Sequence, residues 1–194
     1  MPHDGVVTWA AVILTGGTAA RLGGADKAAL EHGGRTLLEG ALVAVAGAAE
    51  LLVVGPETQT SVPVRFVHED PAGGGPLAGV AAGVAALDGA HERVVVLAVD
   101  MAQVTAGTVG RLLEAAAEVD AAWLTDGTGR RQLAGVVRPS LVPPPDRAHG
   151  APMRLLMSAG TSRDVPARGD EADDIDNWDD LARLRRDDPS GPRT

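Results

Sequence analysis

The feature that most constrains the fold is a set of short apolar runs that stop abruptly at glycine or aspartate. The run at residues 94–99 is unbroken and ends at Asp100, and the run at residues 10–14 is followed by paired glycines. Apolar runs without polar alternation are typical of strands that are buried on both faces, as in parallel sheets. We predict the first strand at residues 8–14 and further strands at residues 51–54, 64–67, 94–99, 121–124 and 133–137.

Helical patterns occupy the segments between these strands. Thr36 and Glu39 have the spacing of a capping box that opens a helix, and apolar residues recur at helical spacing through 77–87. Strand, loop and helix therefore alternate at least three times. This order predicts an α/β fold, a three-layer, doubly wound and mostly parallel sheet of the Rossmann-like kind. We expect a single domain over residues 1–186 and a disordered tail at residues 187–194.

Composition excludes several classes of function. The chain has 194 residues, a formal net charge of −9 and no cysteine. A net acidic charge argues against sequence-independent nucleic-acid binding, and the absence of cysteine excludes disulfides and thiolate chemistry. The five histidines lack a metal-binding spacing, and no Gly-x-Ser-x-Gly nucleophile motif is present. No signal peptide and no apolar run of ~20 residues is found, so we expect a cytoplasmic protein without nucleic-acid or membrane partners.

The loop after the first strand carries the strongest functional signal. It contains Gly16 and Gly17, then Arg21, and finally Lys27. Backbone N–H groups of such a turn, with a helix N-terminus behind them, attract anions, and the two cations add full positive charges. A polyphosphate is the simplest ligand, although a glycine-rich turn with two solvated charges would have the same composition. The spacing matches neither the dinucleotide fingerprint nor the P-loop.

Two carboxylates follow other predicted strands. In open α/β sheets ligands collect outside the carboxyl ends of the strands, where Asp70 and Asp100 are expected. Asp100 is either a cap of the next helix or a ligand of Mg²⁺, which takes one or two carboxylates together with substrate phosphates. Asp70 belongs either to a plain surface turn or to a site where it accepts hydrogen bonds from a base or a ribose.

The full spacing of the first loop resembles a narrower signature. Residues 14–27 fit L-x-G-G-x-x-x-R-L-G-G-x-D-K, which is similar to the signature of the MobA-type nucleotidyltransferases, the molybdenum cofactor guanylyltransferases. Residues 75–79, Gly-Pro-Leu-Ala-Gly, resemble a second motif of that family. Asp100 with Met101 matches its P-x-D-M-P-F segment, in which both prolines and the phenylalanine are replaced here. The resemblance covers about residues 8–186 and is loose after residue 139.

The resemblance implies a reaction and a set of site residues. The implied reaction transfers GMP from GTP to the terminal phosphate of Mo-molybdopterin and releases pyrophosphate, with Mg²⁺ as cofactor. The paired glycines resemble the GTP-using members rather than the cytidylyl enzymes. The implied catalytic residues are Arg21, Lys27 and Asp100, with Asp100 also the metal ligand. The implied nucleotide-binding residues are Leu14, Thr15, Gly16, Gly17, Lys27, Asp70 and Asp100.

For several further residues, the sequence is compatible both with a role in the site and with a position on the solvated surface. Residues 174–181 resemble a C-terminal motif of the family, so Asp174 and Asp176 either reach the metal or the acceptor or form an acidic helix start capped by Asn177. Gln132 also matches a family position. A solvated surface is favoured for three arginines that could face a pterin phosphate, namely Arg138, Arg147 and Arg154.

Other functions remain as alternatives. One is a related transferase with another base or acceptor, such as a molybdenum cofactor cytidylyltransferase or a transferase for a phosphorylated small acid. Another is a non-catalytic nucleotide-binding or delivery protein. We expect a monomer or a weak homo-oligomer that contacts molybdenum insertion or target enzymes.

Overall fold

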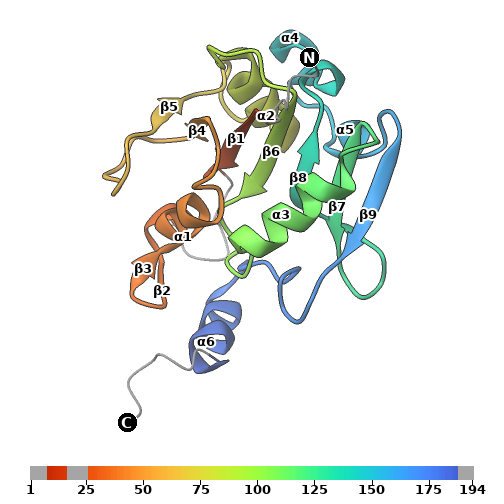
Figure 1. Cartoon of the computed structure of the whole chain (residues 1–194). Helices are drawn as coiled ribbons and strands as arrows, with labels where there is room; N and C mark the ends of the chain where they lie inside the picture. The colour runs from red at the N-terminus through yellow and green to blue at the C-terminus, as the bar shows by residue number, and fades with distance from the viewer. Residues whose placement is uncertain (1–7, 17–25, 188–194) are drawn as a thin grey trace, which may run out of the picture.

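A seven-stranded sheet forms the middle layer of the fold (Figure 1). The computed structural model describes residues 8–16 and 26–187. Within them the strand order is β5-β4-β1-β6-β8-β7-β9, and β8 alone runs antiparallel to its two neighbours. The predicted mostly parallel α/β sheet is therefore confirmed. The strands are β1 (Trp9–Leu14), β4 (Glu50–Val54), β5 (Arg65–Val67), β6 (Arg93–Ala98), β7 (Ala121–Thr125), β8 (Arg131–Val137) and β9 (Ser162–Pro166).

Helices cover both faces of the sheet (Figure 1). One face carries α1 (Leu37–Ala44), α3 (Ala106–Ala115) and the first turns of α6 (Trp178–Asp187). The other face carries α2 (Pro76–Ala85), α4 (Pro145–Ala148) and α5 (Arg154–Met157). None of the described helices combines the length and the apolar character that crossing a membrane requires.

The alternation of side chains along each strand explains the unbroken apolar runs. In β1, Ala11 and Ile13 belong to the core under α1 and α3, whereas Ala10, Val12 and Leu14 belong to the core under α2. Consecutive residues of a strand point to opposite faces, and helices cover both faces here. Residues 10–14 of β1 therefore alternate between the two cores, and all five are buried. Each fully buried valine or leucine contributes about 1.5–3 kcal/mol, so the central strands resist displacement. The loops at their ends therefore start from fixed positions.

Several short elements differ from the prediction. The edge strand β9 was not predicted, because Val165 is its only buried residue and it lacks an apolar pattern. The hairpin of β2 (Glu31–His32) and β3 (Arg35–Thr36) was also missed. The segment at residues 139–151, for which no element was predicted, contains the 3₁₀ turn η3 (Pro139–Leu141) and α4. These elements are too short for a sequence period to show.

The helix caps follow the prediction with one correction. Thr36 caps α1 by accepting a hydrogen bond from the N–H of Glu39 (3.1 Å). The Glu39 carboxylate does not complete a capping box, because it accepts a hydrogen bond from the N–H of Ser61 (2.6 Å) instead. Asn177 caps α6 as expected, with its Oδ1 atom 3.0 Å from the N–H of Asp180. The predicted tail lies outside the described residues from residue 188 onward, and α6 includes Asp187.

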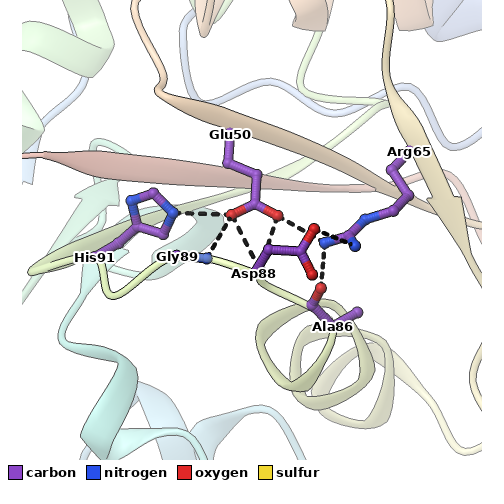
Figure 2. A network of polar contacts seen from close by, with 6 residues as sticks. All are labelled: Glu50, Arg65, Ala86, Asp88, Gly89 and His91. Carbon is purple, nitrogen blue, oxygen red and sulfur yellow. Dashed lines mark hydrogen bonds and ion pairs between the residues drawn. The ribbon is translucent and has the colours of Figure 1, made fainter.

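A polar network ties together the amino ends of three parallel strands (Figure 2). Glu50 opens β4, and its carboxylate accepts hydrogen bonds from Arg65 (2.6 Å) and from the N–H groups of Asp88 (3.0 Å) and Gly89 (3.3 Å). The Nε2 atom of His91 lies 2.9 Å from the same carboxylate. This network joins β4, β5 and the loop between α2 and β6 at the edge opposite the strands' carboxyl ends.

The Glu50 carboxylate should stabilise the fold in a pH-dependent way. Burial alone would raise its pKa, but the donors from Asp88, His91 and Gly89 and the charge of Arg65 together lower the pKa below 4.5. A lowered pKa adds stability that is fully present above about pH 4.5 and is lost as the pH falls through the folded-state pKa. Glu50→Gln should therefore cost about 1–3 kcal/mol at pH 7 and less below pH 4, measured by urea unfolding. The exposed Glu57→Gln is the control, and equal effects of the two changes would contradict this role.

Candidate functional site

The loop after β1 is fastened to β4 at the carboxyl edge of the sheet. Both the N–H and the hydroxyl of Thr15 donate to the carbonyl of Val54, each at 3.1 Å. Gly55, which directly follows β4, has φ of +145°, and a Cβ there would lie 2.0 Å from the Thr15 hydroxyl oxygen. Glycine is therefore required at this position. The consequence is that Gly16 starts its turn from a fixed point beside the end of β6.

Two adjoining clefts lie over this edge. The first has a volume of about 430 Å³, and the second has a volume of about 520 Å³. They share Leu14, Gly16 and Pro76, so they form one trough across the carboxyl ends of β1, β4 and β6. Such volumes suit small-molecule ligands. Pro76 is the first residue of α2, so the positive end of that helix dipole also faces the trough.

Lys27 and Asp100 meet on the floor of the first cleft. Lys27 begins the 3₁₀ turn η2 (Lys27–Ala29), which Asp26 caps by accepting a hydrogen bond from the N–H of Ala28 (3.0 Å). The Lys27 ammonium lies 2.9 Å from Asp100 Oδ2 and 3.3 Å from Asp176 Oδ1. Its burial opposes the charge, but the hydrogen bonds and charges of Asp100 and Asp176 outweigh burial and raise its pKa. Lys27 is therefore a fixed cation at neutral pH.

Within the described part of the chain, a third carboxylate lies near Lys27 and Asp100 besides Asp176. Asp174 also lines the first cleft, and its pKa is raised by partial withdrawal from water and then by the negative charges of Asp176 and Asp100. Among the described residues, no three acidic or histidine side chains are grouped closely enough to hold a metal by themselves. An ion at Asp100 has to take its other ligands from water or from a phosphate chain, as Mg²⁺ commonly does. The donor set fits that arrangement.

Glu171 anchors the acidic segment that contains Asp174 and Asp176. Its carboxylate accepts from the Thr108 hydroxyl (2.7 Å), from both terminal nitrogens of Arg111 (3.0 and 2.6 Å) and from the N–H of Arg168 (2.8 Å). Burial alone would raise the pKa of Glu171, but these donors lower it to about 2. The segment is thereby held against α3. At its other end, the N–H of Ile175 donates to the carbonyl of Asp100 (3.2 Å).

Glu69 lines the second cleft, whereas the residue suggested by the sequence was its neighbour Asp70. Glu69 lines this cleft, and its Oε1 atom accepts a hydrogen bond from the N–H of Gly73 (3.0 Å). Its Oε2 atom is buried and has no hydrogen-bond partner in the described part of the chain. Asp70 is exposed and is not among the residues that line either cleft. No feature of the sequence distinguished these two consecutive carboxylates.

The structure brings most of the predicted site residues together. Seven of the residues singled out from the sequence line the first cleft, and Asp176 reaches it through its contact with Lys27. Gly17 and Arg21 lie outside the described residues. The functional roles of all these residues remain predictions. The seven are Leu14, Thr15, Gly16, Lys27, Asp100, Gln132 and Asp174.

The antiparallel strand β8 supplies the far wall of the first cleft. Because β8 runs opposite to its neighbours, its first residues lie at the site edge, and Arg130, Arg131 and Gln132 line the cleft there. Arg138 follows the other end of β8 and pairs with Asp120 (3.1 Å) away from the cleft. Of the three lining residues, only Gln132 was singled out from the sequence. The wall also includes Leu133, Met153 and Met157.

Comparison with known proteins agrees with this architecture. Residues 11–164 match the family model of the MobA-like NTP transferase domain. A molybdenum cofactor guanylyltransferase of Acidiphilium cryptum is 44% identical over 79 residues, which are 38% of this chain and 40% of that protein. The chain therefore matches about two fifths of the length of this curated relative.

Two solved structures share the fold over nearly the whole chain. A nucleotidyl transferase from Methanothermobacter has a TM-score of 0.77 at 23% identity, with 92% of this chain and 96% of that chain covered. The 2-C-methyl-D-erythritol 4-phosphate cytidylyltransferase of Thermus thermophilus has a TM-score of 0.66 at 24% identity, with 90% and 96% covered. At these identities the likeness concerns the fold.

Removal of the Glu171 charge should loosen the acidic segment. The pKa of about 2, against an ordinary value of 4.5, means that stabilisation is full above about pH 4.5 and is lost as the pH falls toward 2. Glu171→Gln should lower the free energy of unfolding by roughly 2–3 kcal/mol at pH 7. Urea unfolding at pH 7 and pH 3 measures the difference, with the exposed Glu114→Gln on α3 as control. A loss that is as large at pH 3 as at pH 7 would exclude the carboxylate charge as its cause.

Proposed function

This chain belongs to the MobA-like NTP transferase family, and from that premise we propose that it transfers GMP from GTP to the terminal phosphate of Mo-molybdopterin. The observation that carries the proposal is the pairing of Lys27 with Asp100 (2.9 Å) at the floor of a trough over the strands' carboxyl ends. A cation and a carboxylate beside a glycine turn are the groups that a metal-bound triphosphate requires. The name of the curated relative supports the choice of GTP and acceptor.

The triphosphate would lie along the shared part of the trough. The described part of the chain leaves space beside the backbone at Gly16, since an added Cβ would meet none of its atoms within 4 Å. The amino end of α2 and the Lys27 ammonium provide positive charge on the same side. Lys27 thus neutralises negative charge that develops on the α-phosphate and on the leaving pyrophosphate.

The transfer needs little covalent chemistry from the protein. An oxygen of the acceptor phosphate forms a bond to the α-phosphorus, the bond from that phosphorus to the bridging oxygen breaks, and pyrophosphate leaves with the electron pair. The attacking phosphate is already ionised, so no general base is required. Asp100 would hold Mg²⁺, which neutralises phosphate oxygens when it is bound. Asp174 and Asp176 supply further negative charge near this ion.

Base selection is assigned to the second cleft. A carboxylate presents only acceptors, and guanine presents two adjacent donors, its N1–H and its amino group. Cytosine and adenine place a ring acceptor beside the amino group, which a carboxylate repels. Glu69 has one oxygen fixed by Gly73 (3.0 Å) and one without a partner among the described residues, so a guanine would supply the missing donor.

The direct test is pyrophosphate release from GTP and Mg²⁺ with and without Mo-molybdopterin. We expect release that requires the acceptor. Lys27→Ala should lower kcat about 10²–10³-fold, the scale of losing one transition-state donor. Asp100→Asn should abolish Mg²⁺-dependent release, and an unchanged Mg²⁺ dependence would contradict the assignment. Asp179→Asn, at an exposed carboxylate of α6, should change neither kcat nor the response to Mg²⁺. Binding of GTP without any release would identify a nucleotide-binding or delivery protein instead.

Thermal-shift measurements with GTP and CTP test which base is bound and whether Glu69 or Asp70 recognises it. In the presence of Mg²⁺, GTP should raise Tm more than CTP does. Glu69→Gln should remove most of that difference, because its amide places a donor against the donors of guanine, and Asp70→Asn should preserve it. Loss of the difference in Asp70→Asn alone would return base recognition to Asp70, and a larger shift with CTP would point to a cytidylyltransferase.

A further inference from the structure

Three consecutive glycines precede α2, and the middle one differs from its neighbours. Gly73 and Gly75 are exposed, line the second cleft and have φ of +83° and +87°, a conformation that favours glycine. Gly74 is buried, does not line the cleft and does not have a positive φ. The backbone angle at residue 74 therefore leaves the presence of glycine there unexplained.

Close packing from another segment accounts for Gly74. A Cβ atom there would lie 2.4 Å from Nδ1 of His149 and 2.7 Å from Cβ of Ala78, and both distances are too short for non-bonded atoms. The edge of the His149 ring thus occupies the space that a side chain at residue 74 would need. Because His149 follows α4, this contact joins the loop before α2 to the loop after α4.

His149 and Gly150 are the two central residues of a tight turn. The N–H of Ala151 donates to the carbonyl of Ala148 (3.1 Å), His149 has φ of −62° and ψ of 124°, and Gly150 has φ of +69°. These angles are those of a type II turn, whose third position favours glycine. Ala148 is fully buried in the core under α2. The turn is therefore anchored to the core at its first residue.

The same turn holds the glycine loop through the backbone. The N–H of Gly150 donates to the carbonyl of Gly74 (2.9 Å). One residue earlier, the N–H of Gly73 donates to Oε1 of Glu69 (3.0 Å). Gly73 thus connects the residue that the turn fastens to the carboxylate that lines the second cleft. A displacement of the loop would therefore release or turn the Glu69 carboxylate.

We infer that His149 and Gly150 are positioning residues for the second cleft, because their turn holds residues 73–75 in place and these residues hold Glu69. Neither His149 nor Gly150 is among the residues that line the two clefts, so both act through Gly74. The inference rests on the proposed function in taking a nucleotide base as the ligand of Glu69. Selection of the base then depends on a turn outside the cleft.

Nucleotide binding tests the role of the His149 ring. His149→Ala should weaken binding of GTP with Mg²⁺ about three- to tenfold, the scale of one lost hydrogen bond, and reduce the preference for GTP over CTP. The value of kcat at saturating GTP should not change, since Lys27 and Asp100 are untouched. His149→Phe, which keeps a flat ring, should restore most of the binding. Asp146→Ala, at an exposed residue of α4, is the control and should change none of these quantities.

A double-mutant cycle tests the contact with Gly74. Gly74→Ala should weaken GTP binding at least about tenfold, because the added methyl group forces the loop away from the turn. The same change should cost less in the His149→Ala background, where one of the two close contacts is gone. An equal cost in both backgrounds would show that the ring does not constrain the loop.

Hydrogen exchange separates this inference from the proposed function. Without nucleotide, the backbone amide of Gly73 should exchange about three- to tenfold faster in His149→Ala than in the unaltered chain or in Asp146→Ala. Faster exchange in a chain that does not prefer GTP over CTP would support positioning by the turn and show that the proposed base recognition is wrong. Unchanged exchange at Gly73, or an unaltered GTP preference in His149→Ala when the parent chain prefers GTP, would overturn the inference.

Discussion

The ion pair between Lys27 and Asp100 is the interaction on which the site depends. It joins the loop after β1 to the end of β6, and the same ammonium also contacts Asp176 on the C-terminal segment. A partly buried charge is tolerated only where an opposite charge balances it. Among the described residues, Asp100 and Asp176 both contact this lysine, and the pKa of Asp174 is raised first by desolvation and then by the charges of Asp176 and Asp100. A divalent cation bound at Asp100 would add positive charge beside these carboxylates.

The Glu50 network lies at the amino edge of the sheet, whereas the two clefts lie at its carboxyl edge. At the amino edge, Glu50 satisfies backbone and side-chain donors from three segments, and these contacts hold the strands in register. At the carboxyl edge, Gly16, Gly55 and Asp100 follow β1, β4 and β6, and Gly16 and Asp100 line the first cleft. Because the contacts at the amino edge hold the strands in place, the carboxyl edge can remain open to a ligand while the strand ends keep their positions.

Prediction from sequence succeeded where burial leaves a pattern. β1 and β6 are covered on both faces, so their apolar runs could be placed, and Lys27 and Asp100 were expected in one site at the carboxyl edge of the sheet. It failed where burial is slight, as in β9, where only Val165 is buried. The neighbours Glu69 and Asp70 show a different limit. Both follow β5, and which of two consecutive carboxylates faces a cleft is decided by the local turn of the backbone, which residue types alone do not determine.

The direction of β8 explains the remaining difference. The rule that ligands gather at the carboxyl ends of strands directs attention to Arg138, which follows β8 and instead pairs with Asp120 at the other edge. A signal for the reversal is present in the sequence, since Asp126-Gly127 begins a short glycine-rich turn between two apolar strands, a pattern typical of a hairpin. In a hairpin the second strand starts where the first one ends. Applied here, this reasoning moves Arg130 and Gln132 to the edge where the first cleft lies, so that residues at the start of β8, rather than those after its end, line that cleft.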